Sequence, residues 1–262
     1  MNDVGYNQQG VKIRTEGYLD GSESIVLEVL DLRKRFGTVE VICGFTARVE
    51  RSSIVALVGG NGAGKSTIIN LISGFLKADA GTVKLMGRDI TGLTPRRISQ
   101  CGVGRTFQEV RIFSQLTVLE NVLVAVQDRP FKLRRTSGDI DRAREALDLV
   151  GLSSRHYVRA EELSYAEQKF LSIARAMARR PLLLLMDEPA SGLDMRSYQQ
   201  LQTLIEEVRQ QGSTIVVVEH NLEFVRNVAS EILFLEYGVC SAKGSPEEII
   251  RRPDLMERYF GG

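Results

Sequence analysis

The segment 59–67 carries the residues of this chain that are best suited to chemistry. Its sequence, GGNGAGKST, fits the pattern G-x-x-x-x-G-K-[ST]. Glycines let a backbone curl around phosphate groups without Cβ clashes, and the amides of such a loop and of a following helix supply partial positive charge. Lys65 is placed to meet the β- and γ-phosphates of a nucleotide, and the Ser66 hydroxyl to ligate Mg²⁺. The predicted nucleotide-binding residues are Gly59, Gly60, Asn61, Gly62, Ala63, Gly64, Lys65, Ser66 and Thr67.

The segments on either side of this loop are those that a phosphate-binding loop needs. Residues 54–58 form an apolar, β-branched run, which predicts a buried strand. Residues 67–72 continue as a helix with an apolar face. A glycine-rich turn that matches the pattern by chance is the alternative, and the strand and helix around the motif argue against it.

Two adjacent acids form a second candidate site. The apolar run 182–186 ends in Asp187 and Glu188. Beside a phosphate loop, Asp187 is placed to hold Mg²⁺ through its water shell, and Glu188 to polarise the water that attacks the γ-phosphate. The alternative is that two acids at a strand end simply face solvent.

The remaining sequence predicts an α/β fold. Residues 25–49 and 81–87 are expected to form small antiparallel strands. Helical periodicity covers 116–127 and 140–152, with a loop between them at 128–139. The shared apolar face of the second helix consists of Ala143, Ala146, Leu147 and Val150.

The second half of the chain supplies further strands. The continuous apolar runs 182–186 and 214–218 are typical of parallel strands that are covered on both faces. A hairpin is expected over 231–243, and a charged helical tail follows it.

Composition limits the class of protein. The chain has 262 residues and a formal net charge of +1, which gives no support for nucleic-acid binding. Cys43, Cys101 and Cys240 lack metal or disulfide spacing, so buried free thiols are expected. No apolar run reaches the roughly 20 residues that span a bilayer, and residues 1–24 are expected to be a flexible extension rather than a signal peptide. We therefore expect a cytoplasmic protein that reaches the membrane only through a partner.

A capped helix precedes the strand that carries the acids. Ser164 and Glu167 fit S-x-x-E, a capping box that opens a helix over 165–179. One interpretation is a well-capped helix and nothing more, and the other is a helix whose N-terminus faces a phosphate.

The order of the motifs resembles the ATP-binding domain of ABC (ATP-binding cassette) proteins. The phosphate loop is followed by Gln108, by Leu163-Ser164-x-x-x-Gln168, by Asp187-Glu188 and by His220. The resemblance covers residues 25–262 and includes five motifs in the family's order. It implies a P-loop ATPase fold with a mostly parallel core sheet, a small antiparallel β-subdomain and a helical subdomain inserted at about 109–180.

The resemblance also assigns roles to residues. Phe36 matches the aromatic that stacks on adenine, although a core position is the alternative. Gln108 matches the glutamine that joins the metal region to the transporter interface. His220 matches the switch histidine near the γ-phosphate. Asp194 lies in the loop that crosses the dimer interface. The resemblance thus implies that the catalytic residues are Glu188, His220 and Gln108. The implied metal ligands are Ser66, Gln108 and Asp187. The signature, which contacts ATP of the opposite subunit, consists of Ser164, Tyr165, Ala166 and Glu167. His156 fits no motif and is expected at the surface.

The signature departs from the family's LSGGQ, because this chain has Leu163-Ser164-Tyr165-Ala166-Glu167. Tyrosine in the first glycine position is familiar from amino-acid importer subunits. If Ala166 needed a positive φ, it would cost about 1–2 kcal/mol. The Glu167 carboxylate near a triphosphate is unfavourable unless a helix N-terminus or a counter-charge screens it. On this basis a dissimilar partner ATPase is a hypothesis.

Two local segments narrow the subfamily. Residues 102–113 (GVGRTFQEVRIF) and 253–261 (PDLMERYFG) are similar to the ATPases of branched-chain amino-acid importers, a group that includes urea and amide importers. The resemblance implies ATP and Mg²⁺ as cofactors, and as partners a second ABC ATPase, membrane permeases and, indirectly, a solute-binding protein. A soluble non-transport ABC machine, a lipopolysaccharide-type exporter ATPase and a P-loop kinase or small GTPase are the alternatives.

Overall fold

A computed structural model describes residues 4–6, 12–14, 24–126 and 136–260 of the chain. The predicted N-terminal extension therefore falls largely outside the described residues. Within it, β1 (Val4–Tyr6) and β2 (Lys12–Arg14) pair as antiparallel strands.

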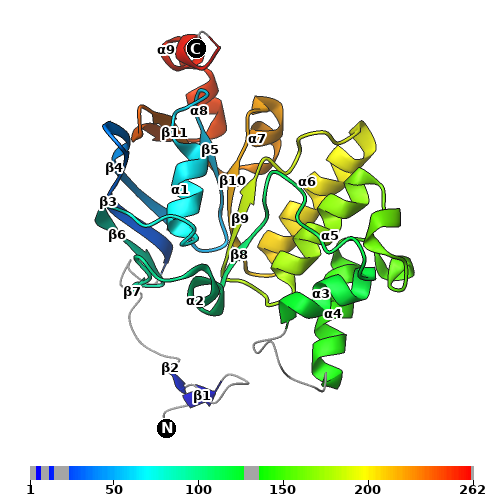
Figure 1. Cartoon of the computed structure of the whole chain (residues 1–262). Helices are drawn as coiled ribbons and strands as arrows, with labels where there is room; N and C mark the ends of the chain where they lie inside the picture. The colour runs from blue at the N-terminus through cyan, green and yellow to red at the C-terminus, as the bar shows by residue number, and fades with distance from the viewer. Residues whose placement is uncertain (1–3, 7–11, 15–23, 127–135, 261–262) are drawn as a thin grey trace.

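The central sheet has six strands in the order β12-β11-β5-β10-β9-β8 (Figure 1). Its bounds are β5 (Ile54–Val58), β8 (Val103–Arg105), β9 (Leu183–Asp187), β10 (Thr214–Val218), β11 (Glu231–Glu236) and β12 (Val239–Gly244). All neighbours are parallel except the β11–β12 hairpin. Every residue of β5, β9 and β10 is buried, which explains their continuous apolar sequences.

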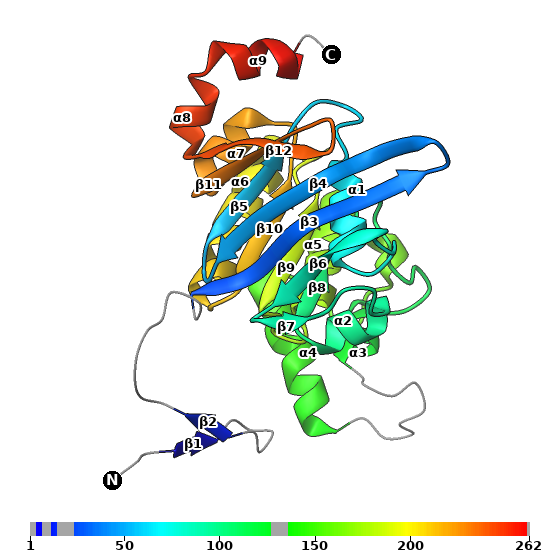
Figure 2. The same cartoon turned by 90° about the vertical axis from the view of Figure 1, so that its left-hand side faces the viewer.

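A four-stranded antiparallel sheet lies beside the central one (Figure 2). Its strands are β3 (Ile25–Phe36), β4 (Val39–Glu50), β6 (Ala80–Leu85) and β7 (Arg88–Asp89). The β3–β4 hairpin is much longer than the short apolar runs predicted. Both strands extend into polar segments. Only part of each strand faces the core, and the pairing register shifts at several positions.

The two faces of the central sheet belong to different cores. In β5, Ile54, Ala56 and Val58 pack into a core formed mainly with helices, whereas Val55 and Leu57 face the antiparallel sheet and α1 (Lys65–Ile72). This alternation follows from the two-residue period of a strand. The phosphate loop, which joins β5 to α1, therefore sits on an element anchored from both sides.

The helices of the first core include those predicted from periodicity. They are α3 (Val118–Val126), α4 (Ser137–Leu149) and α5 (Tyr165–Met177), which contact one another, and α6 (Met195–Gln210) and α7 (Leu222–Val228). The remaining short elements are α2 (Pro95–Gln100), α8 (Pro246–Ile250), α9 (Pro253–Phe260) and the 3₁₀ turns Ser153–Arg155 and Ala160–Glu162. None of the helices within the described ranges is long and apolar enough to cross a bilayer.

Three local expectations need correction. The loop predicted at 128–139 gives way to α4 at Ser137, because Thr136 and Asp139 form a capping box, and 127–135 lie outside the described residues. His156 is half-buried rather than at the surface, and its Nε2 is enclosed. The three cysteines are free as expected but only partly buried, and Cys101 and Cys240 pack against the edge of a core.

Candidate functional site

The phosphate loop has the conformation that its glycines allow. Gly62 and Gly64 have φ values of 76° and 104°, in the left-handed region. A Cβ on Gly64 would lie 2.6 Å from the Cδ1 atom of Ile42, so a larger residue would also collide with β4. Gly64 directly precedes α1 and leaves the first amides of that helix without a side-chain cap. The loop therefore offers backbone amides to an anion.

Lys65 is folded back onto the loop. Its Nζ donates to the carbonyl oxygens of Gly59 and Gly60, at 2.6 and 2.8 Å, and the residue is only 6% exposed. Burial lowers the pKa of Lys65, while the nearby Glu188 and Asp187 oppose that shift. The ammonium group is thus held at the loop, where phosphate oxygens are alternative acceptors.

Asp187 ends β9 beside β10, so it lies at the carboxyl edge of the parallel sheet. Its Oδ2 is 3.6 Å from Nη2 of Arg105, and both side chains are nearly enclosed. Its Oδ1 is buried and lacks a hydrogen-bond partner among the described residues. Burial raises the pKa of Asp187, although the Arg105 guanidinium opposes that effect.

Glu188, Gln108 and His220 meet at the same edge. Oε1 of Glu188 pairs with Nε2 of His220 at 2.8 Å, and Oε2 accepts a hydrogen bond from Nε2 of Gln108 at 2.8 Å. The three residues follow β9, β8 and β10, which are neighbours in the sheet. Glu188 has φ 47°, an unusual conformation for a residue with a long side chain, and its amide donates to the carbonyl of Val218. The structure therefore unites the three residues that the sequence predicted to be catalytic.

The signature forms the first turn of α5. Ser164 is the N-cap, and the reciprocal hydrogen bonds between Ser164 and Glu167 confirm the predicted capping box. Nε of Arg155 lies 3.3 Å from Oε1 of Glu167. Burial opposes ionisation, but hydrogen bonds from Ser164 and the Arg155 charge together hold the pKa of Glu167 below its usual value. Either a helix N-terminus or a counter-charge was expected to be needed to screen this carboxylate, and both are present.

Ala166 does not have the conformation considered from the sequence. It lies inside α5 and is absent from the residues with positive φ, so the steric penalty expected for a positive φ is wrong. The LSGGQ glycine at this position is replaced without backbone strain in this chain, because an alanine suits a helix.

The other predicted nucleotide contacts occupy separate places. Phe36, at the end of β3, is 47% exposed, which excludes the core alternative. Ser66 is exposed in the first turn of α1, next to the half-buried Thr67. Asp194 caps α6 by accepting from the amide of Ser197. In the described parts of the chain, the signature and the phosphate loop share no hydrogen bond or ion pair.

Sequence reasoning missed three buried charged residues around the site. Arg105 pairs with Asp187, as described above. Glu219 accepts from the amides of Ala190 and His220. Lys169 donates to the backbone carbonyls of Glu188 and Pro189. Their position beside motif residues was the only available signal, since a charge within an apolar segment shows neither its burial nor its partners.

Comparisons with known proteins agree with this geometry. The ABC transporter family model matches residues 43–191. The chain is 36% identical over 249 residues to the high-affinity branched-chain amino acid transport ATP-binding protein LivG of Salmonella typhimurium, which covers 90% of this chain and 98% of the relative. It is also 36% identical over 250 residues to BraF of Pseudomonas aeruginosa, a protein of the same description, with the same coverage.

Solved structures show the same fold. A nucleotide-free ATP-binding cassette from an ABC transporter matches with a TM-score of 0.84 and 29% identity, over 91% of this chain and 100% of that one. The ADP conformation of MJ1267, an ATP-binding cassette of an ABC transporter, matches with the same score and identity over 91% and 99% of the two chains. The α/β cassette predicted from the sequence is confirmed, and the chain belongs to the ATP-binding proteins of the ABC transporter family, whose members generally hydrolyse ATP.

Proposed function

We propose that this chain binds and hydrolyses ATP to drive the import of branched-chain amino acids or related small polar solutes through partner permeases. The observation that carries the ATPase proposal is Glu188, held between Gln108 and His220 at the strand edge that also carries Asp187. The solute proposal rests on the similarity to LivG and BraF, which extends over nearly the whole length of both relatives.

The residues present suit a magnesium ion. Asp187 has a buried carboxylate oxygen without a partner among the described residues, and Ser66 has an exposed hydroxyl at the start of α1. Oxygen donors of this kind are the ligands that Mg²⁺ prefers. We propose that Ser66, Asp187 and the Gln108 side chain hold Mg²⁺ with the nucleotide, where the ion would neutralise charge on the phosphates.

The remaining residues divide the chemistry among them. Residues 59–67 bind the phosphates through backbone amides and Lys65, and Phe36 stacks on the adenine. The Glu188 carboxylate orients the attacking water and accepts its proton, and His220 lies beside it to contact the γ-phosphate. The signature residues Ser164, Tyr165, Ala166 and Glu167, together with Asp194, face ATP bound to a second ABC ATPase subunit. ATP then favours the closed pair, and hydrolysis releases it.

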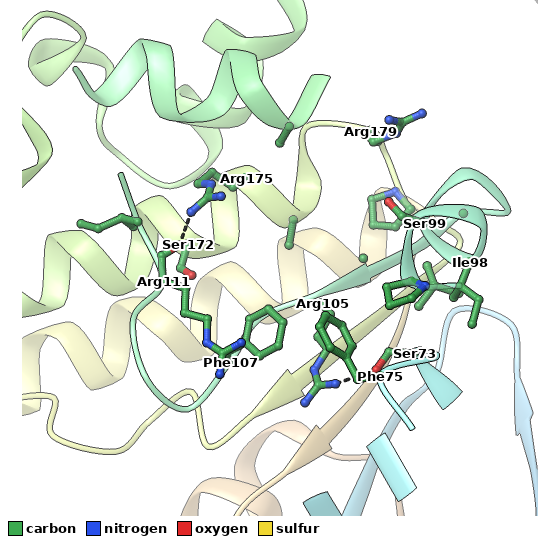
Figure 3. Close-up of a pocket in the computed structure, with 18 of the residues that line it drawn as sticks. Ser73, Phe75, Ile98, Ser99, Arg105, Phe107, Arg111, Ser172, Arg175 and Arg179 are labelled. Carbon is green, nitrogen blue, oxygen red and sulfur yellow. Dashed lines mark hydrogen bonds between the residues drawn. The ribbon is translucent and has the colours of Figure 1, made fainter. Parts of the chain in front are cut away.

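A groove beside Gln108 is a candidate for the permease contact. It has a volume of about 500 Å³ and lies between the sheet edge and α5 (Figure 3). Phe75, Phe107 and Phe113 line it together with Arg105 and Arg175. Apolar rings with charged rims are typical of protein–protein contacts. We place the chain at the cytoplasmic face of the membrane through this contact, with the solute-binding protein acting on the permease from the other side.

The domain division follows from the same proposal. Residues 25–262 form the ATPase domain, and the helices α3, α4 and α5 constitute the helical subdomain within about 109–180. The segment 1–24 has no assigned role.

The test is reconstitution of the chain with the permease subunits of its transporter. Vesicles that contain the complex and a binding protein should take up leucine or a related solute only with ATP inside the compartment that faces this chain. Release of phosphate without solute movement would support a non-transport machine, and outward movement of a lipid would support an exporter. Absence of ATP hydrolysis in the assembled complex would overturn the proposal.

A further inference from the structure

Lys169 is a buried charged side chain near the site that the chemistry above does not use. It is 7% exposed and lies within α5, one turn after the signature. Its Nζ donates to three backbone carbonyls of the loop after β9: Glu188 at 3.1 Å, Pro189 at 3.1 Å and Ser191 at 2.5 Å. An ammonium group has three donors, so this loop satisfies all of them.

The same loop also contacts Glu219, which follows β10. Oε1 of Glu219 accepts from the amide of Ala190 at 2.8 Å. A cation thus binds the carbonyls of the loop, and an acid binds one of its amides. Both groups are buried, and charge-assisted hydrogen bonds of this kind are about twice as strong as neutral ones. The loop needs such support because it starts at Glu188, whose φ of 47° is unfavourable.

Tyr165 extends this contact to the signature itself. The ammonium of Lys169 lies 5.5 Å from the centre of the Tyr165 ring. A Cβ built on Gly192 would be 3.0 Å from Cε1 of the same ring, so Tyr165 also packs on the end of the loop. The tyrosine that replaces the usual glycine therefore bridges the signature and residues 188–192.

We propose that Lys169 is a positioning residue that fixes the backbone of Glu188 and, with Tyr165, ties the signature turn to that backbone. This inference rests on the proposed function, in which Glu188 acts on ATP in its own subunit and the signature contacts ATP in the opposite one. Movement of α5 when the signature binds one nucleotide then passes through Lys169 to the residue that hydrolyses the other. Lys169 does not touch the nucleotide, and its effect is on the placement of Glu188.

The test compares Lys169→Met, Lys169→Arg and the unchanged chain in complex with its partner subunits. We expect Lys169→Met to lower kcat by about 10–100-fold, because misplacement of a reacting group by about 1 Å has that effect, and to change the ATP dissociation constant by less than about threefold. Lys169→Arg keeps charge and donors and should recover part of kcat. Lys243→Met removes an ammonium that pairs with Glu231 on the β11–β12 hairpin and serves as the matched control.

Hydrogen exchange provides the second readout. Amides within 188–192 should exchange at least about tenfold faster in Lys169→Met, while those of α1 keep their wild-type rates. If Lys169→Met does not fold, Lys169→Gln takes its place with the same expectations. Unchanged exchange at 188–192, or a kcat within about twofold of wild type, overturns the inference. If the wild-type complex itself fails to hydrolyse ATP, the proposed function is wrong, and the exchange measurement still decides the role of Lys169.

Discussion

Replacing Glu188 with glutamine should stop hydrolysis without disturbing the site. The wild-type carboxylate pairs with His220 through Oε1 and accepts from Gln108 through Oε2, both at 2.8 Å. A glutamine has nearly the same shape, and its amide can accept from Gln108 and donate to a ring nitrogen of His220. Both contacts therefore survive, whereas the group that we propose accepts a proton from water is lost.

The expected fall in the rate of ATP hydrolysis follows from the loss of this one group. A general base contributes about 10²–10⁴-fold to a rate, which corresponds to roughly 3–5 kcal/mol of activation free energy. Phosphate release by the partner-bound Glu188→Gln variant should fall by that factor. Nucleotide titration should give an ATP dissociation constant within about threefold of wild type, and sedimentation should show an ATP-dependent pair that persists.

The matched control is Glu223→Gln, which changes an exposed glutamate in the first turn of α7. It should retain wild-type turnover, which shows that loss of a negative charge near His220 is not sufficient. If Glu188→Gln hydrolyses ATP at a rate within about threefold of wild type, Glu188 is not the base. A lost affinity for ATP would show that the carboxylate serves binding rather than chemistry.

Three further outcomes are expected. Lys65→Ala should weaken ATP binding by about 10–100-fold, because charge-assisted hydrogen bonds contribute about 1.5–3 kcal/mol. His220→Ala should instead keep the affinity for ATP within about threefold of wild type and lower kcat. If nucleotide titrations show equal losses of affinity in the two variants, the switch role of His220 is refuted. Ala166→Gly should destabilise α5 by about 1 kcal/mol in thermal unfolding, without strengthening ATP-driven self-association. Glu167→Gln preserves the capping box but removes the charge that pairs with Arg155. Self-association, measured by sedimentation in the Glu188→Gln background, should therefore change by less than about threefold. A clear increase in self-association would show that the Glu167 charge repels the nucleotide of the opposite subunit.

The strands that carry the site could be predicted because each is buried on both faces. β5, β9 and β10 are uninterrupted apolar runs, and the loop or acids that follow each run are local in sequence. The capping box of α5 was equally accessible, since Ser164 and Glu167 are three residues apart. Local signals of this kind could be read from the sequence, although the equally local capping box of Thr136 and Asp139 at the start of α4 was missed.

The structure adds contacts between segments that are far apart in the chain. Arg105 meets Asp187, and Gln108 meets Glu188, across about 80 positions of sequence. The length of the β3–β4 hairpin was also inaccessible, because its polar residues alternate irregularly around several register shifts. Such pairings depend on which strands become neighbours, and a periodicity within one segment carries no information about its neighbours.

The atypical signature illustrates how tertiary context changes a sequence argument. The hypothesis of a dissimilar partner ATPase depended on a strained Ala166 and an unscreened Glu167. Ala166 is in regular helix, and the Glu167 carboxylate is engaged by its own helix start and by Arg155. Neither physical reason for a weak grip on an identical copy remains. Tyr165 makes contacts within its own subunit, since its ring packs on Gly192 and lies beside Lys169. The departure from LSGGQ is therefore explained by contacts inside one chain, and the identity of the second subunit has to be decided by the self-association of this chain rather than by its signature sequence.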